Sequence, residues 1–556
     1  MRFPRTWRHL RRYRQIIAIL VKYGFTDIVE EARAGLVARF GEKFIPAARR
    51  SFIHLTHQER IRIAVEDLGP TFIKLGQVLS LRPDIIPPDI SAELSKLQDQ
   101  VSPLPFSQME KILCSELATD PSQVFRQIET APLAAASIAQ VHRAYLPNGQ
   151  PVVLKIQRPG IQSLIETDLQ ILHDLAFILH DYIEAKYAQD PLAIVAEFDQ
   201  SIHRELDFLK EGHHIQRFKT YFADDPTIRV PNYYAEYSTS RLLVMDYIEG
   251  IKASQIELLD AAGINRQIVA RNGTNLSFRQ IFELGFFHAD PHPGNILVLP
   301  GNVIALLDYG MVGQIDEASI DCLGDIVIGI LNKDIQRLLR ALENLTGRDL
   351  LSDNVSLRLD INNLVNSYAG VPLKNLHLEA LLRDFFEVVR RYRLSLPSHL
   401  TLMLKALLTV EGLARILYPE FDVMSELQPW IKKIIRRRYD PRRLYRQGFY
   451  LLSDLEALAL ELPRKLRAIL NKASEGNFAI QFQHRNLEHL IAQIKRTSNH
   501  LAMALIIAAL IVASAILIQA NVGKKIFGYS SIGAIGYLIA CLLGIKLLWD
   551  IFHDRK

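Results

Sequence analysis

The chain has 556 residues, of which 49% are hydrophobic and 22% are charged, and its formal net charge is +5. This length exceeds what one hydrophobic core usually holds, so we expect two or more structural regions, a globular body and a membrane-seeking part. Only three cysteines occur, far apart and without metal-ligand spacing, which excludes a disulfide framework and a zinc ribbon.

The N-terminal segment, residues 1–53, is predicted to form basic amphipathic helices. Residues 1–22 hold seven Lys or Arg and no acidic residue, and the apolar stretch that follows is too short for a secretory signal. A second basic cluster lies at 432–446. Each cluster can be a solvated helix face. Otherwise the charges favour anionic lipid headgroups, with the first helix at the membrane interface, and we expect no nucleic-acid partner because apolar segments lie nearby.

The pattern from residue 54 onward predicts an α+β protein with a small β-rich lobe and a larger helical lobe. Residues 54–120 are expected to be a helical extension, and 121–250 a β-rich lobe with inserted helices. Residues 251–475 form the expected helical lobe, and 476–556 a linker and two membrane helices. The strand-like runs in the β-rich lobe are 137–146, 151–156, 230–238 and 241–250. This order is typical of two-lobed nucleotide-binding proteins.

The stretch HADPHPGN and the triplet Asp-Tyr-Gly indicate phosphoryl transfer. Asp290 stands five residues before Asn295 and 18 before Asp308. Kinases use this spacing: the first carboxylate orients the acceptor, and Asn295 with Asp308 would hold Mg²⁺ against the phosphates. The competing interpretation is a transition-metal cluster of His288, Asp290 and His292. The hard oxygen ligands favour Mg²⁺, with His288 bracing the loop and His292 structural.

A kinase site also needs a strand lysine for the phosphates and a glutamate to pair with it. Lys155 lies in the apolar run VVLKI, where an unpaired ammonium would be costly. We expect Glu211 to pair with it and expect Asp207, four residues earlier on the same helix face, to reach the metal and nucleotide together with Glu205. The alternative is a solvated acidic helix face.

The loop between the first two strands departs from ordinary kinases, because alanines replace the expected glycines. Methyl groups there keep the backbone from closing tightly on phosphate, so the nucleotide should be held differently. The residues expected to bind the nucleotide from this lobe, besides Lys155, are Ala134, Ala135, Ala136, Ser137, Met245 and Tyr247.

The C-terminal segment contains two uncharged runs, 501–518 and 526–545, each about long enough to cross a bilayer. They predict a transmembrane helical hairpin, with the nucleotide-binding body on the cytoplasmic side. The alternative is a buried helical hairpin in a soluble protein. Gly536, Ala540 and Gly544 recur every four residues, and a homodimer through this small-residue seam is a hypothesis.

The combined motifs resemble the UbiB-type atypical kinase-like proteins, over residues 54 to about 345. The resemblance rests on Lys74-Leu75-Gly76-Gln77, the alanine-rich loop, Glu205-Leu206-Asp207, HADPHPGN and the Asp-x-Gly triplet. Two departures are Tyr309, where Phe is common, and Ala139, where Gly is frequent. The family has a protein-kinase-like fold, and its Lys-x-Gly-Gln segment covers the active-site cleft. The resemblance implies that Lys74 points toward the nucleotide, near Glu205 and Asp207.

The resemblance further implies a membrane-associated protein that binds ATP or ADP with Mg²⁺. It would support synthesis of an isoprenoid quinone such as ubiquinone or plastoquinone, with prenyl-quinone precursors or biosynthetic enzymes as partners. Four interpretations stay open: an ATPase or kinase of a small or lipid substrate, a protein kinase, a pseudokinase scaffold, and a small-molecule phosphotransferase. The segment that covers the cleft disfavours a protein kinase. The retained Asp290 disfavours a pseudokinase scaffold, and the Lys74 motif disfavours a small-molecule phosphotransferase.

Overall fold

A computed structural model of the chain divides into two compact units, Met1–Tyr445 and Arg446–Lys556, which are described separately. Within them, the structure describes residues 7–25, 55–80, 82, 85–97, 101–187, 190–347, 355–368, 378–392, 394, 396–438, 487–520, 525–526 and 529–553. The second half of the basic cluster at 432–446 and the start of the linker expected from 476 lie outside these residues.

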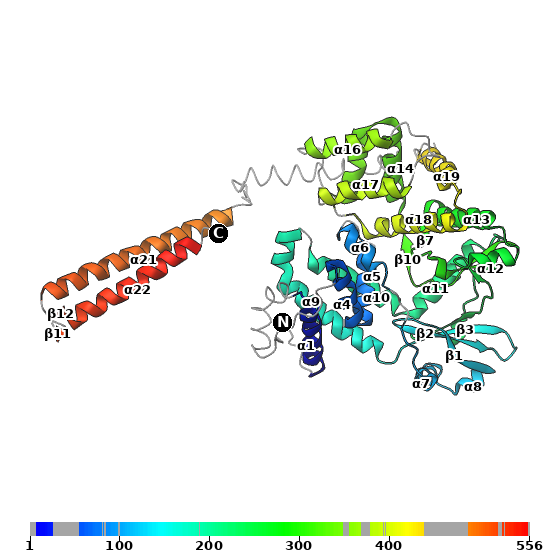
Figure 1. Cartoon of the computed structure of the whole chain (residues 1–556), viewed down its shortest axis with the longest axis horizontal. Helices are drawn as coiled ribbons and strands as arrows, with labels where there is room; N and C mark the ends of the chain where they lie inside the picture. Colours follow the sequence, from blue (N-terminus) through cyan, green and yellow to red (C-terminus); the bar gives the residue numbers. More distant parts are fainter. Residues whose placement is uncertain are drawn as a thin grey trace, which may run out of the picture. The chain divides into compact units, whose positions relative to one another are not determined.

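The first unit contains an antiparallel four-stranded sheet (Figure 1). One face packs against a helix, and the other faces the candidate site. In sheet order its strands are β1 (Gln127–Ala135), β2 (Ala139–Tyr145), β3 (Pro151–Gln157) and β5 (Leu242–Asp246). Helix α7 (Phe106–Leu117) covers one face, where its Met109 packs in a buried cluster with Leu154 and Val244. Side chains alternate along a strand, so Lys155 points to the other face, toward the site.

Three helices link β3 to β5: α9 (Ile161–Tyr187), α10 (Pro191–Glu205) and α11 (Phe208–Tyr221). The chain leaves the helical conformation between α10 and α11. Glu205 is the last residue of α10, and Asp207 is the N-cap of α11 with extended backbone angles, φ −100° and ψ 93°. The prediction that Asp207 and Glu211 share one helix face is therefore wrong. The break turns the two acids of the Glu-Leu-Asp segment to different partners.

The run 230–238, predicted to be a strand, is not one. It contains the short 3-10 helix η2 (Ala235–Tyr237). Pro231 has no N–H to offer a strand ladder, and Asn232 donates both its backbone N–H (2.9 Å) and its side-chain amide (2.6 Å) to the Asp246 carboxylate. These bonds hold the connection against the end of β5.

The HADPHPGN segment lies among small sheets and helices in the second half of this unit. A four-stranded sheet combines, in order, β4 (Ile228–Arg229), β9 (Val303–Leu306), β8 (Ile296–Leu299) and β6 (Ile251–Lys252). A separate pair joins β7 (Phe286–His288) to β10 (Val312–Gln314). Helices α13 (Arg266–Phe278) and α18 (Ser398–Leu417) pack against each other beside these strands (Figure 1).

The remaining described elements complete the helical part of this unit. They are α6 (Pro88–Leu94), α8 (Pro121–Val124), α12 (Ile256–Ala261), the π-helix η3 (Arg279–Leu284), the 3-10 helix η4 (Pro293–Asn295), α14 (Glu317–Asn332), α15 (Ile335–Thr346), α16 (Val355–Tyr368), α17 (Leu378–Arg391) and α19 (Val423–Arg438). Mostly helical content with several small sheets agrees with the α+β class expected from the sequence.

Helix α1 (Trp7–Lys22) corrects the expectation of an interfacial helix whose apolar face meets lipid. Its Tyr13 and Ile16 are buried in the main hydrophobic core, because α1 packs on α4 (His57–Leu68) and α9. Arg12 donates to both carboxylate oxygens of the fully buried Asp168, at 2.7 and 2.9 Å. A partly buried pair of this kind needs such bidentate bonds to offset its desolvation. Only the basic face of α1 is left for a lipid surface.

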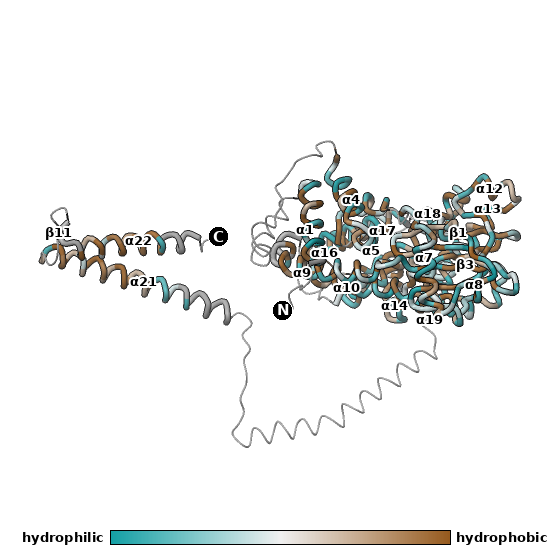
Figure 2. Tube along the Cα trace, turned by 90° about the horizontal axis from the view of Figure 1, so that it is seen from below, coloured by the Kyte–Doolittle hydropathy of each residue, from teal (hydrophilic) through white to brown (hydrophobic). Residues whose placement is uncertain are grey.

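The second unit is a pair of long helices, α21 (Leu487–Gln519) and α22 (Ser531–His553), which pack along each other. The short antiparallel strands β11 (Lys525–Ile526) and β12 (Tyr529–Ser530) lie between them in the sequence. Apolar residues dominate both helices along most of their described length (Figure 2). Within the described residues, one segment, Thr497–Gln519, is long and apolar enough to cross a membrane, while the apolar part of α22, Ala534–Leu547, is shorter.

Candidate active site

Lys155 on β3 contacts two carboxylates, one on helix α11 and one in the loop that follows β9. Its Nζ lies 2.9 and 2.8 Å from the two carboxylate oxygens of Glu211 on α11, and 3.4 Å from Oδ1 of Asp308. Glu211 is 4% exposed and Lys155 15%, whereas Asp308 is 49% exposed. The strand lysine and the helix glutamate therefore meet, as the sequence led us to expect, and Asp308 keeps an accessible side.

The electrostatics of this cluster keep the lysine and the aspartate charged. Burial disfavours the ammonium of Lys155, but the carboxylates of Asp308 and Glu211 outweigh it and hold the lysine pKa above its ordinary value. Lys155 and the N–H of Gly310 hold the pKa of Asp308 well below the usual range. Burial raises the pKa of Glu211 to about 7, against the opposing charge of Lys155.

Lys74 approaches the same cluster from the helical extension. It lies on α5 (Pro70–Ser80), is 8% exposed, and its Nζ is 2.5 Å from Oε1 of Glu205. Among smaller contributions, the charge of Glu205 also raises the pKa of Lys155. Gly76 is explained by packing, since a Cβ there would stand 2.5 Å from a methyl of Leu97.

Asp207 has an unused oxygen. Its Oδ1 is buried and has no hydrogen-bond partner in the described part of the chain, and its Oδ2 lies 3.6 Å from Lys210 Nζ. A buried carboxylate oxygen without a partner is costly, which favours a cation or a ligand donor at this position. Carboxylate and amide oxygens such as those of Asp207, Asp308 and Asn295 are the hard ligands that suit Mg²⁺.

The loop that carries Asp290 is braced by histidine, as the sequence indicated. Buried His288 contacts the carbonyl oxygen of Asp308 through Nε2, and its Nδ1 accepts the N–H of Asp290 at 3.2 Å. The Asn295 amide lies 3.5 Å from the Asp290 carbonyl oxygen. His292 accepts the N–H of Gly294 at 3.1 Å. No group of three His, Cys, Asp or Glu able to hold a metal occurs in the described ranges, which disfavours the transition-metal interpretation.

The alanine-rich segment is a tight hairpin and not an open loop. Ala134 and Ala135 belong to β1 and pair with Val141 and Gln140 of β2, which corrects their placement between strands. The turn closes with a bond from Ala136 N–H to the carbonyl of the residue three positions on (2.8 Å). Ala136 and the fully buried Ser137 begin this turn.

Met245 and Tyr247 lie at the end of β5. Met245 is buried and pairs with Val153 of β3, and the N–H of Tyr247 donates to the Pro151 carbonyl (3.1 Å). The guanidinium of Arg143 lies 4.2 Å from the centre of the Tyr247 ring. No nucleotide contact tests their expected role, so that role stays a prediction.

Sequence reasoning missed two basic residues at the site. Lys405, on α18, places Nζ 2.9 Å from Oδ1 of Asp290. Arg158, directly after β3, donates to the Ala136 carbonyl (2.8 Å) and to the Ser102 carbonyl (3.0 Å), so it clamps the alanine turn. A lone lysine inside the apolar run LTLMLKALL was the available signal for Lys405, because a charge in such a helix needs a partner.

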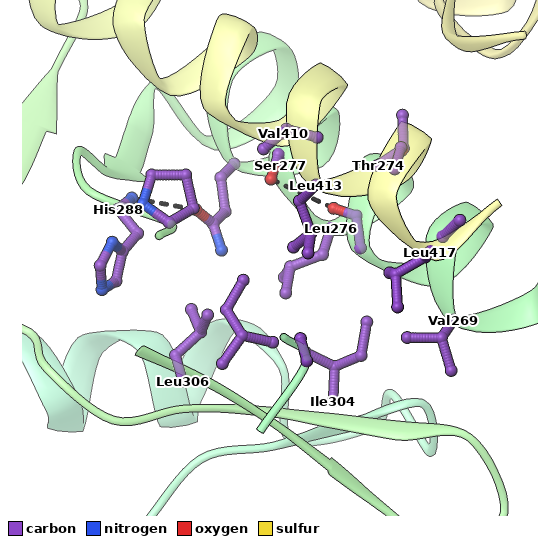
Figure 3. A pocket seen from close by; sticks show the side chains of 17 residues that line it. Val269, Thr274, Leu276, Ser277, His288, Ile304, Leu306, Val410, Leu413 and Leu417 are labelled. Atoms are coloured by element: carbon purple, nitrogen blue, oxygen red, sulfur yellow. Dashed lines mark hydrogen bonds between the residues drawn. The ribbon is translucent and has the colours of Figure 1, made fainter. Parts of the chain in front are cut away.

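A small apolar cavity lies directly behind the catalytic loop (Figure 3). Its volume is about 20 Å³, room for about one water molecule. Helices α13 and α18 and the strands β8 and β9 enclose it, with side chains such as Leu276, Leu413 and Ile304 around it in Figure 3. His288 also lines the cavity. Its backbone N–H donates to Oε1 of buried Gln280 at 3.0 Å, a bond drawn dashed in Figure 3. Buried Gln280 thus holds the start of the loop from its inner side.

Three family descriptions match the chain. They are the ABC1 atypical kinase-like domain over residues 96–342, the UbiB helical domain over 361–422, and the ABC1/UbiB kinase-like C-terminal domain over 485–553. A solved structure of a Mycobacterium tuberculosis protein in complex with erythromycin matches with a TM-score of 0.44 and 22% identity, over 64% of this chain and 90% of that chain.

Curated relatives match along three quarters or more of the chain. A Clostridium pasteurianum protein, "Uncharacterized protein in hydrogenase 1 5'region", is 33% identical over 98% of this chain and 99% of its own. A "Probable protein kinase UbiB" of Xanthomonas campestris is 31% identical over 91% of this chain and 93% of its own, and one of Marinobacter nauticus is 33% identical over 76% and 78%. Because these relatives share 31–33% of their residues over three quarters or more of this chain, and the three family descriptions match in addition, the chain belongs to the UbiB-type atypical kinase-like family.

Proposed function

We propose that this protein is a membrane-anchored, Mg²⁺-dependent ATPase that supports isoprenoid-quinone synthesis. The observation that carries the ATPase part is the contact of Lys155 with Glu211 and Asp308, beside the loop of Asp290 and Asn295. This cluster has a fixed cation for phosphate oxygens and acids for a metal and an acceptor.

Different residues of the site bind the phosphates, hold the metal and orient the attacking water. Lys155, held by Glu211, binds the α- and β-phosphates. Asp308, Asn295 and Asp207 would hold Mg²⁺, which neutralises phosphate charge when bound. Asp290 orients a water on the terminal phosphorus and takes its proton. The new water–phosphorus bond forms as the bond from phosphorus to the bridging oxygen breaks, so ADP leaves with its electron pair and inorganic phosphate remains.

The membrane part rests on the apolar helices of the second unit. Thr497–Gln519 has the length and composition to span a bilayer, and α22 packs beside it. We infer that both helices enter the membrane with the nucleotide-binding unit on the cytoplasmic side, where the exposed basic face of α1 attracts anionic headgroups. The quinone role is inferred from the relatives named UbiB, with prenyl-quinone precursors or their enzymes as partners.

Phosphate release from ATP by the purified full chain tests this proposal, with Mg²⁺ and with or without anionic liposomes. Asp308→Asn should abolish release, because the half-exposed carboxylate is the proposed metal ligand. Asp260→Asn is the matched control, since Asp260 is 52% exposed and pairs with Arg266. Nucleotide binding without hydrolysis under any condition would favour a scaffold instead.

A genuine protein kinase is the second candidate, because relatives carry the name "Probable protein kinase". Against it stands Lys74, which reaches the site from a segment outside the ordinary kinase fold and pairs with Glu205. Labelled phosphate transferred from ATP to an added protein, and lost in Asp308→Asn, would favour this candidate.

A further inference from the structure

Lys405 has a position that packing does not explain. It lies in the middle of α18, whose neighbouring Leu404 and Ala406 are buried in the core, yet its own side chain is 30% exposed. Its Nζ lies 2.9 Å from Oδ1 of Asp290, which is 33% exposed. An ion pair with this exposure stabilises a fold by less than about 1 kcal/mol, so stability is a weak reason for a lysine here.

The partner of Lys405 is the carboxylate proposed to orient the attacking water. That carboxylate has two oxygens, and Lys405 takes Oδ1, so Oδ2 can accept from the water. An ammonium has three N–H donors, and one bond to Asp290 leaves two others for additional acceptors. The attacked terminal phosphate must lie within reach of the water that Asp290 orients, and its oxygens are the acceptors of that region.

The other two lysines of the site are placed elsewhere. Lys155, paired with Glu211 and Asp308, is assigned to the α- and β-phosphates, and Lys74 pairs with Glu205. His292, two residues after Asp290, accepts a loop N–H and stays within the loop. Phosphoryl transfer spreads negative charge over the equatorial oxygens of the transferred group, and a fixed cation beside them stabilises the transition state. Lys405 is therefore the described lysine beside Asp290 that can supply this charge.

We propose that Lys405 is a further catalytic residue, which holds Asp290 and contacts the terminal phosphate of bound ATP. The proposal rests on the proposed function. Lys405 keeps its proton throughout, while the proton of the water goes to Asp290, the water oxygen binds phosphorus, and ADP departs. Because α18 also packs on α13, the lysine has a rigid support.

The test compares Lys405→Met and Lys405→Arg with the wild-type full chain. Two quantities are measured with Mg²⁺: the kcat of phosphate release, and the affinities for ADP and for a non-hydrolysable ATP analogue. Lys405→Met should lower kcat about 100-fold, as the loss of one transition-state donor does elsewhere. It should lower the preference for the analogue over ADP about tenfold, leaving ADP affinity within about twofold. Lys405→Arg should recover part of both losses, because it keeps the charge.

Lys433→Met is the matched control. Lys433 lies on α19, and its Nζ is 3.0 Å from Oε2 of Glu283 in another exposed pair. This variant should leave kcat and both affinities unchanged. A melting temperature for every variant separates lost function from lost folding, and Lys405→Arg supplies the second variant if Lys405→Met does not fold.

The outcomes are distinct for the two proposals. If the wild type binds nucleotide and Lys405→Met keeps both kcat and the analogue preference within about threefold, Lys405 is not catalytic and only this inference fails. If the wild type binds nucleotide without hydrolysing it, the relative affinity for the ATP analogue over ADP becomes the test. A drop of about tenfold in Lys405→Met supports the contact with the terminal phosphate, and an unchanged ratio rejects it. If the wild type binds no nucleotide, the proposed function fails and the inference fails with it.

Discussion

Both carboxylate oxygens of Glu211 accept hydrogen bonds from Lys155, and the Glu211 side chain is almost completely buried. The pair crosses from strand β3 to helix α11, two elements separated by the long helices α9 and α10. Its geometry sets the position of the ammonium relative to Asp308, which accepts from the same nitrogen at 3.4 Å. A change in either partner therefore affects stability and nucleotide binding together.

Lys155→Met should destabilise the protein by about 3 kcal/mol and abolish ATP binding. The mutation leaves the carboxylate of Glu211 buried without its counter-charge, and removing one partner of a buried pair is far costlier than its net contribution. Without the ammonium, the pKa of Glu211 should rise further above its ordinary value. Denaturant unfolding and a nucleotide-binding titration of the full chain in detergent measure the two effects.

The double variant Lys155→Met/Glu211→Met separates these effects. Replacing both members by apolar residues of similar size removes the buried charge, so most of the lost stability should return. ATP binding should stay absent, because the phosphate cation is missing. A double variant as unstable as the single one would show that the pair does not limit stability.

The sequence predicted the site better than the path of the chain between its parts. Lys155 was recognisable because an apolar strand demands a partner for an ammonium, and Asp290, Asn295 and Asp308 by their spacing. Periodicity could not show the break at Leu206, since the acidic residues around it fit a continuous helix. The partner of Lys405 was equally hidden, because it is 115 residues away in the chain.

Tertiary packing also decided two segments that local patterns left ambiguous. The amphipathic pattern of α1 fits a lipid surface and a protein core equally well, and the contact of Arg12 with buried Asp168 settles it in favour of the core. The alanine-rich segment was predicted to be a loop because ordinary kinases carry a Gly-rich loop at this position. Its pairing with β2 depends on the tight turn at Ala136, which local propensity does not reveal.

Thr274→Val should stabilise the protein by about 1 kcal/mol. Thr274 is fully buried beside the cavity of Figure 3, and its hydroxyl has no hydrogen-bond partner in the described structure. Valine has the same shape without the unmet polar group. Thermal unfolding measures the change. Ser277→Ala is the contrasting variant, because that hydroxyl donates to the Gly273 carbonyl at 3.1 Å and its loss should not stabilise.

Gly212→Ala should destabilise the protein by about 1–3 kcal/mol and weaken nucleotide binding. A methyl group there would overlap the ring of Tyr233, so α11 must shift, and with it the neighbouring Glu211. Gly412→Ala on α18 is the matched control, because a Cβ there meets nothing within 4 Å. That change should stabilise by about 0.5–1 kcal/mol through helix propensity. Equal effects of the two variants would contradict the overlap.

His203 should make stability depend on pH near neutrality. Its Nε2 lies 2.9 Å from Glu166 Oε1 and its Nδ1 lies 2.8 Å from the Asp199 carbonyl, so both nitrogens face acceptors, as only the imidazolium can satisfy. Glu166 holds the pKa of His203 above its usual value. A raised histidine pKa contributes stability that is fully present below the unfolded pKa and is lost as the pH rises through the folded one.

Melting temperatures of wild type and His203→Gln should therefore differ at pH 6 and converge by pH 9. The difference should stay below about 3 °C, because the side chain is partly exposed and solvent screens the pair. His213→Gln, on the next helix α11, is the control for the loss of a histidine side chain. A difference that grew with pH would reverse the sign and refute the charged state assigned to His203.

The small-residue seam of α22 should act in two separate ways. Gly536 and Ala540 serve contacts within the chain: a Cβ at Gly536 would overlap the hydroxyl of buried Ser514 on α21, and Ala540 is 3% exposed. Gly544 has open space around its Cα, so it is the residue of the seam left for a second copy. Gly536→Leu should therefore separate α22 from α21, while Gly544→Leu should weaken self-association and leave that pairing intact.

Two readouts distinguish these effects in the full chain reconstituted into bilayers. The distance between spin labels on α21 and α22 reports the pairing within one chain. Energy transfer between differently labelled copies reports association. We expect Gly536→Leu to lengthen the first distance and Gly544→Leu to reduce the second signal. Unchanged energy transfer in Gly544→Leu would remove the case for a dimer through this seam, because Gly536 and Ala540 are already occupied by α21.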